Sequence, residues 1–164
     1  MPKLTPNLWF DKNAEDAANF YVSIFPNSRV TNVNRSPADF PSGKAGDVVT
    51  VDWELDGHPF TGINGGTDFQ FNESISFLID CKDQAEVDRY WDALIAGGGE
   101  PSMCGWLKDR FGVSWQVVPR QLNELIGGSD PEGAKRAMEA MLQQTKLDVA
   151  ELERAYRGEL TAAR

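Results

Sequence analysis

Histidine and cysteine are scarce in this chain, which limits the chemistry that it can support. Its 164 residues include one histidine, His58, and two cysteines, Cys81 and Cys104. Two cysteines are too few for a disulfide scaffold, and one histidine makes a histidine-based metal site or catalytic triad hard to build. We interpret His58 as a surface residue beside a hairpin turn and Cys104 as a buried, inert thiol.

Long apolar runs and an excess of basic residues are also missing. No run of about 18 apolar residues occurs, so no membrane-spanning helix is expected, and no signal peptide precedes the first predicted strand. Acidic residues outnumber basic ones by 25 to 16, which gives a net charge of −9. Nucleic acids and anionic membranes require a basic face on their partner. We therefore expect a cytoplasmic protein that binds neither.

The most distinctive stretch, residues 104–119 (CGWLKDRFGVSWQVVP), predicts two short strands around a tight turn at 109–112. Gly112 occupies the last position of that turn, where type I turns favour glycine. Beyond it, apolar residues alternate with Ser114 and Gln116, which is the period of a half-buried strand. Burying an amide without a partner costs roughly 1–3 kcal/mol. Gln116 is therefore either a hydrogen-bonded core amide or a side chain that faces a cavity.

Residues 105–116 (GWLKDRFGVSWQ) resemble the PhnB-like branch of the vicinal-oxygen-chelate superfamily, which includes glyoxalases and bleomycin-resistance proteins. Members of this branch often carry a demethylubiquinone methyltransferase label. The resemblance covers about residues 3–120. It implies a curved eight-stranded mixed sheet around a cleft. No S-adenosylmethionine-binding motif accompanies these residues, so methyl transfer is not expected.

The chain repeats one order of elements twice. In the first half we expect a strand at 4–10, a helix that Asp11 or Asn13 caps, and strands at 28–34, 48–55 and 58–63. The Asp56-Gly57 pair between the last two strands is a strong signal for a two-residue hairpin. The second half repeats this order with a strand at 74–80, a helix at 83–94, a short strand near 100–103 and the hairpin of residues 104–119.

This repeat predicts an α+β fold of two β-α-β-β-β modules, at residues 1–66 and 72–119. Together the modules form a predicted glyoxalase-like domain at 1–120. The residues that follow, 121–164, are expected to form a C-terminal helical extension. One of its helices begins at Asp130-Pro131, because an aspartate cap followed by proline favours a helix start.

Metal-dependent members of the superfamily place ligands at four corresponding points, which the repeat locates near Thr5, Thr61, Ser74 and Gln116. None of these residues is histidine, glutamate or aspartate. Neutral hydroxyls and amides are poor ligands for zinc, nickel or iron. We therefore expect no metal and no cofactor in the cleft, and isomerase, dioxygenase and fosfomycin-transferase activities lose support.

Turn geometry predicts which side chains face the cleft. Across the Asp56-Gly57 hairpin Asp52 opposes Thr61, so the two share a face. Combined with strand alternation and the resemblance, this predicts a set of ligand-binding residues: Asn7, Trp9, Thr61, Ser74, Ser76, Trp106 and Gln116. Asp52 is the candidate general base, and a solvated or hydrogen-bonded strand aspartate is its alternative. Trp106 is either a ligand platform or a core or interface residue.

Three functions remain open. The first is a small-molecule-binding protein that holds an aromatic or amphipathic ligand between tryptophans. The second is a metal-independent lyase or isomerase, with Asp52 as base and Gln116 and Ser74 as polarising donors. The third is a structural or regulatory homodimer with a vestigial cleft. A homodimer is expected in every case, because the superfamily often completes its clefts across a dimer and the extension carries apolar stripes.

Overall fold

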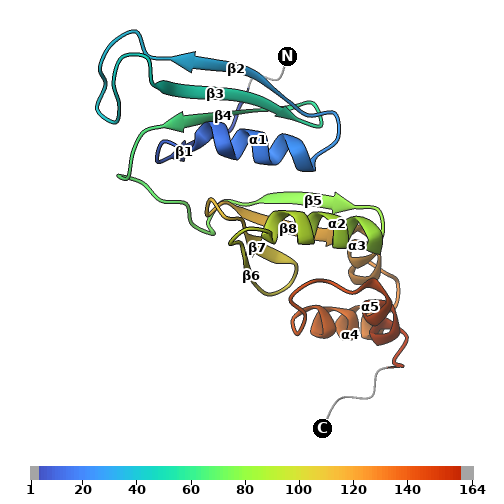
Figure 1. Cartoon of the computed structure of the whole chain (residues 1–164). Coiled ribbons are helices and arrows are strands. Elements are labelled where there is room, and N and C mark those ends of the chain that lie inside the picture. Colours follow the sequence, from blue (N-terminus) through green and yellow to red (C-terminus); the bar gives the residue numbers. More distant parts are fainter. Residues whose placement is uncertain (1–3, 160–164) are drawn as a thin grey trace. The chain divides into compact units, whose positions relative to one another are not determined.

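The computed structural model describes residues 4–159, so the outermost residues of the predicted domains, 1–3 and 160–164, lie outside the described part. The chain divides into two compact units, Met1–Phe71 and Asn72–Arg164. Each unit holds one β-α-β-β-β module with a four-stranded mixed sheet, and the second also carries the C-terminal helices (Figure 1). The predicted α+β class, the two modules and the helical extension are confirmed. Each unit has its own sheet of four strands, and the joining of the two into one curved sheet of eight stays a prediction.

The first unit places a helix against one face of its sheet. The strand order is β1-β4-β3-β2, with β1 parallel to β4 and the other pairs antiparallel. Its elements are β1 (Asn7–Phe10), α1 (Ala14–Ile24), β2 (Arg29–Arg35), β3 (Val48–Leu55) and β4 (His58–Asn64).

Alternating side chains of β3 and β4 build the core of this unit. Val51, Trp53 and Leu55 of β3 are buried, whereas the residues between them are half-buried. The ring of Trp53 stacks on Phe60 of β4 with centroids 5.8 Å apart. Gly62 allows this packing, because a Cβ there would lie 2.9 Å from Trp53 and 3.0 Å from Ala14 of α1. Burial of each large apolar side chain contributes about 1.5–3 kcal/mol.

Two local predictions for this unit have different outcomes. Asp56 and Gly57 both have positive φ, 46° and 81°, as a two-residue hairpin requires, and the predicted pairing of Asp52 with Thr61 is confirmed. Asn13 is the residue before α1 but makes no side-chain capping bond. The first amide of the helix, that of Ala14, instead donates to Asn64 Oδ1 at the end of β4.

The second unit has the strand order β5-β8-β7-β6, with β5 parallel to β8 and the other pairs antiparallel. Its module consists of β5 (Phe77–Cys81), α2 (Gln84–Ile95), β6 (Glu100–Pro101), β7 (Trp106–Lys108) and β8 (Ser114–Pro119), and the extension of α3 (Arg120–Ile126), α4 (Pro131–Met141) and α5 (Val149–Tyr156).

The first strand of this module begins three residues later than predicted, at Phe77 instead of Ser74. The Asn72 side chain accepts hydrogen bonds from both the amide and the hydroxyl of Ser74. Such local side-chain bonds compete with strand pairing. Ser74 and Ser76 therefore precede the strand and do not follow its alternation.

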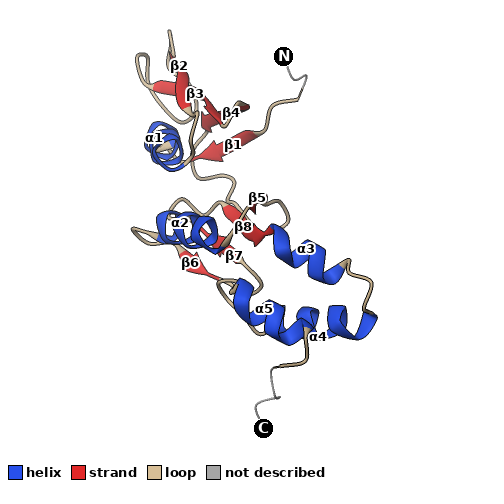
Figure 2. Ribbon diagram, turned by 90° about the vertical axis from the view of Figure 1, so that its right-hand side faces the viewer, coloured by secondary structure: helices blue, strands red, loops and turns tan. Residues whose placement is uncertain are grey.

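The helical extension packs on its own unit (Figure 2). Its core is a buried cluster of Val118, Leu122, Leu147 and Leu152. The helix start predicted at Asp130 is confirmed, because its carboxylate accepts a hydrogen bond from the Glu132 amide. No helix among residues 4–159 is both long and apolar enough to cross a membrane.

Candidate functional site

The face of the first sheet that points away from α1 is polar and internally hydrogen-bonded. Asn7, Asp52 and Thr61 occupy neighbouring positions on three adjacent strands, because Thr61 pairs with Asn7 on one side and Asp52 on the other. The Thr61 hydroxyl donates to Asp52 Oδ1 at 2.7 Å. Farther along, Asn34 Nδ2 donates to Thr50 Oγ1 at 2.9 Å. The predicted side chains of this unit thus share one surface.

Trp9 lies on the same face and is held there by a hydrogen bond and an aromatic contact. Its indole N–H donates to the carbonyl of Gly66 at 2.9 Å, and its ring meets Phe69 edge-on with centroids 5.0 Å apart. Gly65 is required for this position, since a Cβ there would lie 2.0 Å from the ring. Phe69 remains 65% exposed. The two rings therefore offer a pre-positioned aromatic surface.

Gln116 is the centre of the corresponding face in the second unit. It pairs with Leu78 of β5 on one side and Trp106 of β7 on the other. Its Nε2 donates to Ser76 Oγ at 2.8 Å, while its Oε1 accepts no hydrogen bond from the described residues. Leu78 is 57% exposed. Gln116 is thus a half-buried, partly satisfied amide between an exposed apolar side chain and an indole.

Two further features border this face. Lys108, two residues from Trp106 on β7, forms an ion pair with Glu73, and the hydrogen bond between them raises the pKa of Lys108 and lowers that of Glu73. At the other end, Val118 lies on the same side of β8 as Gln116 and belongs to the core of the extension. The extension therefore covers the end of the face that carries Gln116.

The four side chains at the superfamily's ligand points do not fit a transition metal. The Thr61 hydroxyl donates to Asp52, the Gln116 amide donates to Ser76, and Ser74 bonds with Asn72. Within residues 4–159 no three histidine, cysteine, aspartate or glutamate side chains gather closely enough to hold a metal ion. Neutral hydroxyl and amide donors bind first-row metals poorly, so these positions support no metal-dependent step.

The remaining reactive residues lie apart from both faces. His58 is exposed, as predicted. Cys81 is buried, and burial raises the pKa of its thiol to about 12. Cys104 was predicted to be buried, but it is partly exposed. Its backbone takes a positive φ of 61° at the turn before Trp106.

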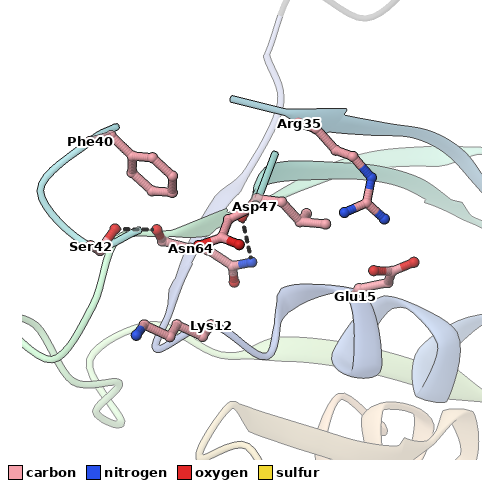
Figure 3. Close-up of a pocket in the computed structure, with 8 residues that line it drawn as sticks. Lys12, Glu15, Arg35, Phe40, Ser42, Asp47 and Asn64 are labelled. Carbon is pink, nitrogen blue, oxygen red and sulfur yellow. Dashed lines mark hydrogen bonds between the residues drawn. The ribbon is translucent and has the colours of Figure 1, made fainter. Parts of the chain in front are cut away.

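A pocket that no sequence pattern indicated lies in the first unit, where the β1–α1 turn meets the loop between β2 and β3 (Figure 3). Its volume is about 310 Å³. The residues around it come from three stretches of the chain, 12–15, 35–48 and the end of β4: Lys12, Glu15, Arg35, Phe40, Ser42, Asp47, Val48 and Asn64. The sequence did not predict this pocket, because no periodic pattern links segments so far apart.

Comparison with known proteins places this fold in a family. The family described as 3-demethylubiquinone-9 3-methyltransferase matches residues 2–118, which include both modules but not the extension. No curated protein sequence matches the chain.

Solved structures agree with this match. A putative 3-demethylubiquinone-9 3-methyltransferase, PhnB protein, from Bacillus cereus is 32% identical with a TM-score of 0.65, over 72% of this chain and 99% of that one. The protein PA1353 from Pseudomonas aeruginosa is 19% identical with a TM-score of 0.55, over 73% and 98% of the two chains, and shares the fold. The chain therefore belongs to the PhnB-like, 3-demethylubiquinone-9 3-methyltransferase family.

Proposed function

We propose that this protein binds a small aromatic or amphipathic molecule on the polar sheet faces of its two modules. The observation that carries the proposal is the row formed by Leu78, Gln116 and Trp106. This row combines an exposed apolar side chain, an amide with an open acceptor and an indole. Ligand sites typically pair apolar and aromatic walls with a few placed polar groups.

The first module carries a separate face of the same kind. Trp9 and Phe69 offer aromatic surface, while Asn7 and the Thr61–Asp52 pair offer donors and acceptors beside it. Because Asp52 already accepts the Thr61 hydroxyl, it is positioned to orient a ligand without rearrangement. Ser74 and Ser76 would line the site at the entry to β5.

The resemblance further supports a homodimer in which the two sheet types join into curved sheets of eight strands. The outer strands β1 and β5 each have a partner within their own sheet on one side only. Free strand edges present unpaired backbone groups that favour further pairing. Exposed apolar residues flank these edges, namely Leu4 and Ile75. We propose that β1–β5 pairing buries them in the dimer.

A metal-independent lyase or isomerase is the alternative, and one observation favours it. Asp52 is the carboxylate next to Thr61 and Asn7 on the polar face, so a bound substrate would lie within reach of its oxygens. Under this alternative Asp52 accepts a proton, and Gln116 with Ser74 polarises the substrate. Asp52→Asn would then abolish turnover while leaving ligand binding within a few-fold of that of the unaltered protein.

Native mass spectrometry of protein purified without added metal or ligand tests these proposals together. We expect a mass of twice 18.2 kDa with an additional organic mass. A monomer at micromolar concentration would contradict the dimer. A dimer that never carries or binds a small molecule would favour the vestigial cleft, and stoichiometric transition metal would contradict our interpretation of the ligand points.

Substitutions then show where the small molecule detected by mass spectrometry binds. Gln116→Leu and Trp106→Leu should each weaken its binding about tenfold or more, measured by quenching of tryptophan fluorescence, since each removes one anchor. Asp92→Asn is the matched control, because Asp92 is exposed on α2 and not on the sheet. Equal affinity in all three variants would show that the molecule binds elsewhere.

A further inference from the structure

Lys108 is the only basic residue in the four strands of the second sheet. It lies two residues from Trp106 on β7, so alternation directs both side chains to the same face. The pairing with β8 agrees, because Lys108 lies opposite Ser114 and Trp106 lies opposite Gln116. A single cation therefore borders the row of Leu78, Gln116 and Trp106 on which the proposed function depends.

The serine opposite this lysine has a buried hydroxyl without a partner. Ser114 is 2% exposed, and its Oγ forms no hydrogen bond with a described residue. Residues directly opposed in an antiparallel pair have Cβ atoms about 4.5–5.5 Å apart, so this hydroxyl lies beside the stem of Lys108. Buried polar groups in native proteins are nearly always hydrogen-bonded. The Ser114 hydroxyl is therefore a donor for a ligand oxygen that reaches this end of the face.

Two further side chains add hydrogen-bond donors at the same end of the face. An ammonium group has three hydrogens and a side-chain amide has two. Lys108 uses one for Glu73, and Gln116 uses one for Ser76. Lys108, Gln116 and Ser114 thus each keep a donor, and neighbouring donors, one of them charged, match a carboxylate.

Glu73 is the present partner of the lysine, and it can be replaced at little cost. It lies in the segment before β5 and forms an ion pair with Lys108 on β7. The Glu73 side chain is 61% exposed and that of Lys108 is 34% exposed. Exposed ion pairs contribute little to stability, because water solvates both partners and ordering two long side chains costs entropy. A ligand carboxylate therefore competes with Glu73 on nearly equal terms, and any further contact of the ligand favours it.

The opposite end of the face is apolar and covered by the extension. Val118 lies on the same side of β8 as Gln116 and packs in the buried cluster with Leu122, Leu147 and Leu152. An amphipathic molecule on the row must then direct its apolar part toward Val118 and its polar group toward Lys108. The fold thus sets the direction in which such a ligand lies.

We propose that the molecule bound at this face is an aromatic carboxylate, whose anionic group replaces Glu73 as the partner of Lys108. The inference rests on the proposed function and adds the charge and the direction of its ligand. The carboxylate accepts hydrogen bonds from Lys108 Nζ and, once Glu73 has left and the lysine has shifted, from Ser114 Oγ. The ring lies against Trp106. Because the chain as a whole carries a charge of −9, binding of an anion depends on this one lysine.

Three probes with the same aromatic body and different charge test this proposal: 2-naphthoate, 2-naphthamide and 2-naphthylmethylammonium. Each is titrated into the full chain while the indole N–H signals of its five tryptophans are followed by NMR. A Trp106→Phe variant assigns the Trp106 signal. We expect 2-naphthoate to shift this signal with an affinity at least fivefold above that of 2-naphthamide, and the ammonium probe to bind most weakly.

Variants of the ion pair should change the affinity for 2-naphthoate in opposite directions. Lys108→Met should lower it at least fivefold, to that of 2-naphthamide, whereas Glu73→Gln should raise it about two- to threefold. Ser114→Ala should lower it about threefold without lowering the unfolding temperature, because the hydroxyl has no partner to lose. The matched controls Lys135→Met and Glu139→Gln disrupt a similar exposed pair on α4 and should leave the affinity within twofold.

The possible results separate this inference from the proposed function. Equal affinity of 2-naphthoate and 2-naphthamide at Trp106, or unchanged 2-naphthoate affinity in Lys108→Met, would overturn the carboxylate ligand and leave the aromatic binding face intact. Tightest binding of the ammonium probe would also overturn it, and would assign the face to a cation held by Glu73 and Glu100. No shift of the Trp106 signal with any probe up to 1 mM would overturn both proposals.

Discussion

The indole N–H of Trp115 donates to the carboxylate of Asp109 at 2.8 Å, and both residues are 3% exposed. The other carboxylate oxygen accepts the amides of Phe111 and Val113. One buried aspartate therefore closes the turn between β7 and β8 and also fixes a core tryptophan. The family-specific stretch at 105–116 is organised by this carboxylate.

We predict that Asp109→Asn lowers the free energy of unfolding by about 3 kcal/mol, because an amide replaces one acceptor oxygen with a donor that faces another donor. Urea unfolding followed by tryptophan fluorescence measures the change. The control Asp80→Asn removes an exposed ion pair with Arg120 and should cost about 1 kcal/mol or less. Equal effects of the two variants would contradict the structural role of Asp109.

Gly105→Ala should be far more destabilising than Gly57→Ala, although both glycines have a φ of 81°. At Gly57 no atom lies within 4 Å of an added Cβ, so only backbone strain of about 1–2 kcal/mol is expected. At Gly105 the Cβ would lie 2.8 Å from the Val117 carbonyl and 3.0 Å from Leu147. Similar unfolding temperatures for the two variants would show that the extension shifts to accommodate the added methyl group without loss of stability.

The ion pair between Lys146 and Asp88 predicts a pH-dependent attachment of the extension to α2. The hydrogen bond from Lys146 lowers the pKa of Asp88 below its usual 3.8. A carboxylate whose pKa is lower in the folded than in the unfolded protein stabilises the fold at pH values above its unfolded-state pKa. This contribution is lost as the pH falls through the folded-state pKa. Lys146→Met should cost about 0.5–1 kcal/mol at pH 7, and the difference from the unaltered protein should shrink below about pH 3.

Chemical denaturation of both proteins at the two pH values checks this prediction. Lys135→Met is the control, because Lys135 lies 4.0 Å from Glu139 on the exposed side of α4. A pH-independent effect of Lys146→Met would mean that the lysine contributes by packing and not by charge.

Cys81 should resist alkylation in the folded protein. Its thiol pKa of about 12, which burial raises, leaves a thiolate fraction of roughly 10⁻⁴ at pH 8. In a Cys104→Ser variant, iodoacetamide at pH 8 should leave Cys81 unmodified until denaturant is added, as mass spectrometry would show. Labelling at the rate of a free cysteine would contradict its burial.

Local signals predicted the Asp56-Gly57 turn, the register of β3 with β4 and the start of α4, because neighbouring residues determine them. Asp56-Gly57 set the pairing of β3 with β4, and with it the shared face of Asp52 and Thr61. The alternation around Gln116 likewise located its strand. These features explain why the shared face of Asp52 and Thr61 and the strand of Gln116 were predictable.

Features that depend on distant segments were not predictable in the same way. Asn64 caps α1 from the far end of β4, and Asn72 delays the start of β5. The pocket around Lys12 and Arg35 joins segments that share no sequence period. The joining of eight strands into one sheet depends on edge pairing, which residue alternation does not encode, so it stays a prediction.

The extension also bears on the order in which the protein matures on the ribosome. The amides of Cys104 and Gly105 donate to the carbonyls of Gln144 and Thr145, which are synthesised roughly 40 residues later. At translation rates of about 5–20 residues per second, the turn before Trp106 waits several seconds for these acceptors. The family-specific hairpin therefore reaches its final form only after most of the extension has left the exit tunnel. Premature termination after residue 119 would leave a nascent chain without these acceptors, which chaperones and proteases would recognise as incompletely folded.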